Sequence, residues 1–222
     1  KLYLQTIHRR QVSPGEQENF VRYMLEDIER LDTLINHLLD AARLDRSADR
    51  GEIEQVRLDE VVRSCAEDVR LRCRIPAEAI CVSVEPSLVA ARRVDLNMIF
   101  RNLLDNAVKY AGSPPHVEIV SHPVCEERVV TSVLDNGRGV PRHSRQKIFR
   151  RFVRLGMELE RDKPGTGLGL YIVQTLVRRL GGRVSVRERV PGPGTVFEVH
   201  LPGTPCEPDQ GRQPDQARSA VA

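Results

Sequence analysis

The stretch RNLLDNAVKY, residues 101–110, combines an apolar helical pattern with three polar residues at helical spacing. Asn102, Asn106 and Lys109 recur at i, i+4 and i+7, which places two carboxamides and an ammonium group on one stripe of an α-helix. Apolar residues flank the stripe, and polar groups beside buried surface persist only with partners. A phosphate group with Mg²⁺ would satisfy all three, because an amide oxygen is a hard ligand and Lys is a point charge. Alone, the stripe is as typical of an ordinary helix edge with solvated polar residues.

A second motif, LDNGRGVP at residues 134–141, ends an apolar, β-branched segment. It predicts a strand edge that opens into a tight loop. Ionised Asp135 only accepts hydrogen bonds, so it could receive an exocyclic amino group such as that of adenine. Gly137 and Gly139 allow the backbone to approach a ligand closely. Alone, D-x-G-x-G is a common turn.

A third motif, GTGLGL at residues 165–170, runs directly into an apolar helix pattern. Glycine-rich backbone at a helix N-terminus points N–H groups outwards and carries a positive dipole end, which favours phosphate. A single glycine loop often only turns the chain. The three motifs follow one another at spacings suited to a single nucleotide site.

In their order, these motifs resemble the ATP-binding domain of bacterial two-component sensor histidine kinases, in the superfamily shared with DNA gyrase, MutL and the heat-shock chaperone ATPase. The N, G1, F and G2 boxes of that family are matched by NLLDNAVKYA from Asn102, DNGRGV from Asp135, KIFRRFVR from Lys147 and GTGLGL from Gly165. A weaker match, GPGTVF from Gly192, resembles the start of the terminal strand. The similarity covers about residues 58–202, and four ordered motifs make chance a poor explanation.

The resemblance implies an ATP-dependent protein-histidine kinase that transfers the γ-phosphoryl group of Mg-ATP to a histidine on a helical stalk. The receiver domain of a response regulator would accept the phosphoryl group next. Within the family pattern, Asn106 would bind Mg²⁺, Lys109 phosphate, Tyr110 the sugar or base side, and Asp135 the adenine amino group. Asn102 stands where hydrolytic relatives carry a glutamate, and a neutral amide cannot take a proton from water at pH 7. Asn102 and Lys109 are therefore the expected catalytic residues.

The resemblance also gives the full set of expected nucleotide contacts, in which Asn106 alone is a metal ligand and Thr195 assists at adenine through water. These residues are Asn102, Asn106, Lys109, Tyr110, Asp135, Gly137, Gly139, Val140, Gly165, Thr166, Gly167, Leu168, Gly169, Leu170 and Thr195. Residues 154–163 would form a lid over the nucleotide. Phe149 and Phe152 resemble the aromatic positions that anchor the lid, although two phenylalanines three apart are as easily core residues.

The expected fold class is α+β, a two-layer α/β sandwich of the Bergerat type with helices on one face of a mixed sheet. Helices are expected at about residues 58–74, 93–111 and 169–180. Strands are expected near residues 81–84, 117–121, 129–134, 184–187 and 196–201.

Upstream, apolar residues between Met24 and Ala42 alternate spacings of four and three, the seam of a helix that packs in a coiled-coil-like bundle. By resemblance this is the second helix of a dimerising hairpin that would make the full-length protein a homodimer. We therefore expect residues 1–46 to be a partial hairpin that lacks the phosphoacceptor segment, and residues 47–57 to be a hinge. Residues 58–202 would form the ATP-binding domain, and the polar, Pro-rich residues 203–222 a disordered tail.

Composition excludes some classes of function. The formal charge of +3 and the few aromatic residues give no sign of nucleic-acid binding. The five cysteines are odd in number and lack CxxC spacing, which favours reduced thiols in the cytoplasm. No apolar run approaches the roughly 20 residues that cross a bilayer, so any inner-membrane anchor of the full-length protein would lie upstream.

Two alternatives remain open at this level. One is a non-catalytic scaffold or nucleotide-sensing dimer that binds ATP without transferring it. The other is a serine kinase of the anti-sigma type from the same superfamily, which the hairpin-like helix disfavours.

Overall fold

The computed structural model describes residues 15, 18–25, 28, 35, 52–155 and 165–207. The chain divides into two compact units, residues 1–50 with 141–175 and residues 51–140 with 176–222.

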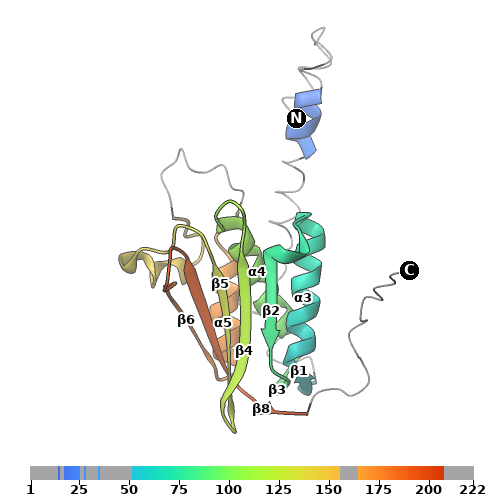
Figure 1. Cartoon of the computed structure of the whole chain (residues 1–222), viewed down its shortest axis with the longest axis vertical. Helices are drawn as coiled ribbons and strands as arrows, with labels where there is room; N and C mark the ends of the chain where they lie inside the picture. The colour runs from blue at the N-terminus through green and yellow to red at the C-terminus, as the bar shows by residue number, and fades with distance from the viewer. Residues whose placement is uncertain are drawn as a thin grey trace, which may run out of the picture. The chain divides into compact units, whose positions relative to one another are not determined.

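The larger unit is built on a five-stranded sheet (Figure 1). Its strands, in the spatial order β2-β4-β5-β7-β6, are β2 (Ile80–Val84), β4 (Val117–Cys125), β5 (Arg128–Asp135), β7 (Thr195–Pro202) and β6 (Arg183–Glu188). β2 pairs in parallel with β4, and the other pairs are antiparallel. The sheet is therefore mixed, as predicted, and all five expected strands are present.

Helices α3 (Leu58–Cys73) and α4 (Arg93–Tyr110) pack against each other and against this sheet. Ile99, Phe100 and Leu103 on α4 are fully buried, because their spacing brings them to one face of the helix. α4 begins where the Arg92 guanidinium donates to Asp95 in the first turn, at 2.8 and 2.9 Å. This layer of helices confirms the expected two-layer α/β architecture.

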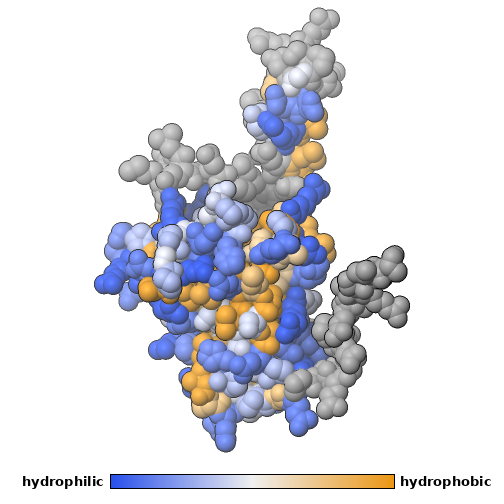
Figure 2. Space-filling model, in the orientation of Figure 1, coloured by the Kyte–Doolittle hydropathy of each residue, from blue (hydrophilic) through white to orange (hydrophobic). Residues whose placement is uncertain are grey.

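Buried positions alternate with half-buried ones over the first part of β4 and the later parts of β5 and β7, as the pleat requires, whereas residues 129–131 and 195–197 are buried consecutively. The positions between the buried ones include Glu118, Ser132 and Glu198. Figure 2 shows hydrophilic and apolar residues mixed over the side of the molecule turned to the viewer.

A second, three-stranded sheet was not predicted from the sequence. It joins β1 (Glu54–Arg57), β3 (Ser87–Ala91) and β8 (Thr204–Pro205) in the antiparallel order β1-β3-β8. β1 lies within the segment expected to be a hinge, and β8 within the segment expected to be a disordered tail. Both expectations are wrong for these residues, because pairing with β3 satisfies their backbone groups.

Two short 3₁₀ turns of the smaller unit, η2 (Arg142–Ser144) and η3 (Lys147–Phe149), precede helix α5 (Gly169–Arg179) in the chain. α5 starts at the expected residue, and the boundary between the two units falls within it, after Thr175. Of the expected apolar seam, Met24, Ile28 and Ile35 are described, and all three are helical. Ile28 and Ile35 are 59% and 54% exposed. The other seam positions lie outside the described residues. No helix in the described ranges is long and apolar enough to span a bilayer.

Candidate nucleotide-binding site

The polar stripe predicted on residues 102–109 lies on α4. Asn102 is buried, and its Nδ2 donates to the carbonyl oxygen of Met98 at 2.7 Å, so the helix already engages the amide nitrogen. Asn106 and Lys109 are half-buried on the following turns. The Lys109 ammonium lies 5.0 Å from the centroid of the Tyr110 ring, a cation–π contact at the helix end.

Asp135 forms the centre of the site, at the end of β5. Its side chain is almost fully buried, and its Oδ1 accepts hydrogen bonds from the backbone N–H groups of Gly137 at 2.8 Å and Thr195 at 3.2 Å. Burial raises the pKa of Asp135, while these hydrogen bonds, the Thr195 hydroxyl and the charge of Arg189 lower it. The result is a carboxylate held in a fixed orientation with little access to water.

Two glycines allow the backbone to close around Asp135. A Cβ atom on Gly137 would lie 2.0 Å from the carbonyl oxygen of Tyr110, and one on Gly194 would lie 2.0 Å from the carbonyl oxygen of Asp135. Gly194 also has φ of +142°, a conformation that L side chains rarely adopt. The end of α4, the loop after β5 and the start of β7 therefore meet at a distance that only glycine permits.

Asn136 was not singled out by the sequence analysis, although it lies inside the D-x-G-x-G motif. Its Oδ1 accepts the N–H groups of Gly112 and His116, each at 3.0 Å, and its Nδ2 donates to the carbonyl oxygen of Pro114 at 2.9 Å. These three bonds fasten the segment after α4 to the loop that carries Asp135. The only sequence signal was the tendency of Asn to hydrogen-bond backbone in turns.

Arg189, Glu118 and Gly194 were also missed as parts of the site. Arg189 forms an ion pair with Glu118 of β4 and is the charged group that lowers the pKa of Asp135. Arg189 and Glu118 are far from Asp135 in the sequence and carry no local motif, whereas Gly194 lies inside the GPGTVF match. Gly139, with φ of +79°, and half-buried Val140 continue the loop as expected.

The glycine motif at residues 165–170 belongs to the smaller unit. Gly167 has φ of +72°, and a Cβ atom there would lie 2.8 Å from the carbonyl carbon of Phe152. The Phe152 N–H donates to the carbonyl oxygen of Gly167 at 3.0 Å, and the Leu168 N–H donates to Thr166 Oγ1 at 3.2 Å. Gly165 and Leu170 are half-buried, and α5 begins at Gly169.

The two phenylalanines of the F motif differ in their surroundings. Phe149 is buried, whereas Phe152 is 66% exposed and has φ of +62°. Phe149 is therefore a core residue, and Phe152 closes a backbone contact with Gly167. Residues 156–164, which include most of the expected lid, lie outside the described residues.

Within the described ranges, no group of three His, Cys, Asp or Glu residues could hold a metal ion. All five cysteines are free.

Residues 91–205 match the family model described as "Histidine kinase-, DNA gyrase B-, and HSP90-like ATPase". The chain belongs to this ATPase family. The match spans both the α4 stripe and the Asp135 loop, and it confirms the family resemblance and the fold class.

The curated relatives of this ATPase-family chain are sensor kinases. It is 35% identical over 190 residues to the signal transduction histidine-protein kinase/phosphatase MprB of Mycobacterium avium, which covers 83% of this chain and 35% of that protein. It is 35% identical over 205 residues to the sensor histidine kinase AruS of Pseudomonas aeruginosa, covering 86% of this chain and 20% of that protein. The chain thus spans about a third or less of the length of these relatives.

Solved structures agree with the fold. A mycobacterial sensor histidine kinase MprB structure matches 69% of this chain and 99% of its own, with a TM-score of 0.62 and 31% identity. The full-length ShkA structure in complex with AMPPNP matches 89% of this chain and 41% of its own, with a TM-score of 0.67 and 28% identity.

Proposed function

We propose that this chain binds Mg-ATP and is the catalytic part of a two-component sensor histidine kinase. The observation that carries the proposal is the buried Asp135 carboxylate, whose Oδ1 is held by the N–H groups of Gly137 and Thr195. These bonds hold the carboxylate in a fixed orientation, and an ionised carboxylate only accepts hydrogen bonds, so a ligand that binds it must supply a donor. The amino group of adenine supplies such a donor, and a guanine, which carries a carbonyl oxygen at that position, does not.

The α4 stripe would receive the phosphates. Lys109 supplies a cation, and the amide oxygen of Asn106 is a hard ligand of the type that Mg²⁺ accepts. A single protein ligand, the Asn106 amide oxygen, would be sufficient for Mg²⁺ that the phosphates of the nucleotide also bind. When bound, Mg²⁺ neutralises charge on the phosphates.

Asn102 explains why the γ-phosphoryl group would be transferred and not lost to water. A carboxylate at this position could act as general base toward water, but the Asn102 amide is neutral and donates to Met98. In the transfer, a histidine nitrogen attacks the γ-phosphorus, the bond to the β–γ bridging oxygen breaks, and ADP leaves. The imidazole loses its proton to solvent, and the chain contributes positioning and charge neutralisation.

Further assignments follow from the relatives, which are named as signal transduction histidine kinases. The phosphohistidine would donate to the receiver domain of a response regulator. The exposed Ile28 and Ile35 would pack in a homodimeric helical bundle. Because ATP is a cytoplasmic substrate, the chain would act on that side of the inner membrane. The contacts of Gly165–Leu170 with nucleotide also belong to this proposal.

The proposal is tested by calorimetric titration with ADP and with GDP, each with and without Mg²⁺. We expect binding of ADP over GDP, loss of this preference in Asp135→Asn, and loss of the Mg²⁺ dependence in Asn106→Ala. Labelled ATP should then pass its γ-phosphate to a supplied histidine-bearing helical hairpin as an acid-labile phosphoryl group. An acid-stable product would indicate a serine kinase. Binding without any transfer would indicate a scaffold, and a folded chain that binds neither nucleotide would refute the proposal.

A further inference from the structure

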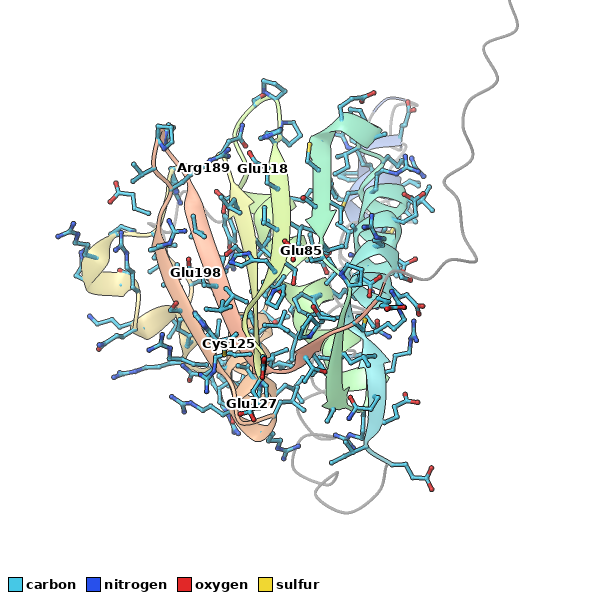
Figure 3. The ribbon with its side chains drawn as sticks, turned by 60° about the horizontal axis from the view of Figure 1, so that its bottom comes forward. Glu85, Glu118, Cys125, Glu127, Arg189 and Glu198 are labelled. Atoms are coloured by element: carbon cyan, nitrogen blue, oxygen red, sulfur yellow. The ribbon has the colours of Figure 1, made fainter. Side chains whose placement is uncertain are left out.

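Polar contacts link Arg189 through Glu118 and His116 to the loop of Asp135, and Figure 3 shows Arg189 and Glu118 next to each other. Arg189 follows β6 and pairs with Glu118 of β4, although two strands, β5 and β7, separate β4 from β6 in the sheet. Glu118 Oε1 also lies 2.9 Å from Nε2 of His116. The backbone N–H of His116 donates to Asn136, the neighbour of Asp135. Arg189, Glu118, His116 and Asn136 thus form a continuous link, in which His116 contributes both its ring and its backbone N–H.

The course of Arg189 brings it close to Asp135. Its backbone N–H donates to the carbonyl oxygen of Gly194 at 3.1 Å. A Cβ atom on Gly194 would lie 3.2 Å from Arg189 Cδ and 2.0 Å from the carbonyl oxygen of Asp135. The Arg189 side chain therefore passes over the segment that packs directly on the end of β5.

Burial makes this ion pair different from an ordinary surface pair. The side chains of Arg189 and Glu118 are 19% and 32% exposed, so water screens the Arg189 charge less than at the open surface. Of the described groups that shift the pKa of Asp135, Arg189 is the charged one. Glu118 pairs with Arg189, and His116 contacts Glu118. The other groups that act on the pKa of Asp135 are hydrogen-bond donors of Gly137 and Thr195, which are neutral.

We propose that Arg189, held in place by Glu118, is a positioning residue that keeps the Asp135 carboxylate ionised and oriented for the amino group of adenine. The inference rests on the proposed function, since it concerns the same site. Arg189 acts through Asp135 and through the turn at Gly194, and it does not itself contact the base. Without it, the buried carboxylate would take up a proton more readily, and a protonated oxygen can no longer accept the amino hydrogen.

The sheet offers a matched control. Arg187 pairs with Glu198 at 2.9 Å between the neighbouring strands β6 and β7. This pair has the same chemistry, and its arginine is two residues from Arg189, but it is not among the groups that act on Asp135. Arg187→Gln therefore removes a comparable ion pair without removing charge from the site.

The test compares the unmodified chain with Arg189→Gln, Arg189→Lys, Glu118→Gln and the control Arg187→Gln. Each is titrated with Mg-ADP and with the diphosphate of purine riboside, which lacks the amino group, from about pH 5 to pH 8. Thermal unfolding followed by circular dichroism shows that each variant is folded. Glu118→Gln keeps the positive charge of Arg189 and removes the carboxylate that pairs with Arg189 and His116, so it serves if Arg189→Gln does not fold.

For Arg189→Gln we expect the acidic limb of the ADP-binding profile to move to higher pH, so that ADP binding on this limb is severalfold weaker than for the unmodified chain. Binding of purine riboside diphosphate should change much less, because only ADP presents an amino group to Asp135. Arg189→Lys should restore the pH profile, and Glu118→Gln should weaken ADP binding with a smaller shift of the profile.

The inference is overturned if Arg189→Gln and Arg187→Gln have the same ADP affinity and the same pH profile while the unmodified chain binds ADP normally. It is also overturned if Arg189→Gln weakens both ligands equally, since that pattern indicates a general structural defect. Failure of the unmodified, folded chain to bind either ligand would refute the proposed function, and this inference with it.

Discussion

Substitution of Gly137 by alanine should weaken nucleotide binding strongly while leaving the domain folded. The added Cβ would lie 2.0 Å from the Tyr110 carbonyl oxygen and 2.9 Å from Asp135 Oδ1. Real Cβ contacts do not fall below 3.0 Å, so the loop and the end of α4 must separate by about 3.0 − 2.0 = 1.0 Å. A displacement of about 1 Å in a positioned site can reduce function about 100-fold, which corresponds to about 2.7 kcal/mol.

The assay is titration calorimetry with Mg-ADP, paired with thermal unfolding. Gly181→Ala is the matched control: Gly181 has φ of +71°, but its added Cβ would meet only Pro202 Cγ at an ordinary 3.6 Å. It should lose about 1 kcal/mol of stability from backbone strain and keep its affinity for ADP. If Gly137→Ala bound ADP as tightly as the unmodified chain, the close contact between the loop and α4 would not be what shapes the site.

Three further predictions concern separate parts of the chain. Phe100→Ala, which empties a fully buried position on α4, should lower the free energy of unfolding in denaturant titrations by about 3–5 kcal/mol; a loss below about 1 kcal/mol would contradict its place in the core. Because burial raises the pKa of Asp135, the folded chain binds a proton at this carboxyl group more readily than the unfolded chain does. The contribution of Asp135 to stability should therefore fall as pH rises through the raised pKa, whereas the affinity for ADP should fall as pH drops through it. Parallel pH profiles for stability and for ADP affinity would argue against this. Burial also raises the pKa of Cys65 to about 11, so a thiol reagent at neutral pH should label exposed Cys81 well before Cys65 in the folded chain.

The fold was predictable where one element carries enough of the pattern by itself. In α4, apolar residues recur over almost five turns, and Ile99, Phe100 and Leu103 are all fully buried. The longer strands β5 and β7 each carry a run of β-branched residues that only a strand places well. Long, strongly periodic segments therefore gave the correct two-layer architecture.

The three-stranded sheet was not predictable, for a physical reason. β1 and β8 have four and two residues, too few for a period to be read, and the five residues of β3, SLVAA, do not alternate apolar and polar positions. Their stability comes from pairing between segments far apart in the chain, such as Leu88 with Thr204. The charged residues around Gly51 and the Pro-rich residues after Gly203 indicated loops, and at β1 and β8 tertiary pairing overrode this indication.

The candidate site also has a part that the sequence predicted and a part that it did not. The motifs identified the residues expected to face the ligand, Asn102, Asn106 and Asp135, because chemistry restricts the residue types there. The residues that hold them were missed. Asn136 binds backbone groups, which are the same in every residue type and so leave no pattern in the sequence. Glu118 and Arg189 are 71 positions apart in the sequence.

The contacts of Asp135 also connect nucleotide binding to strand register. Leu134 pairs with Val196 in the antiparallel β5–β7 ladder, and this register brings the Thr195 N–H to Asp135 Oδ1. A slip of one residue would turn every side chain of β7 to the other face of the sheet and would remove Thr195 from the carboxylate. It would also move Gly194 from its contact with Asp135, where no larger residue fits. The buried carboxylate would then lose two of its neighbours without gaining water, which is unfavourable. The same contacts that orient Asp135 for a ligand therefore help select the one register in which β5 and β7 can pair.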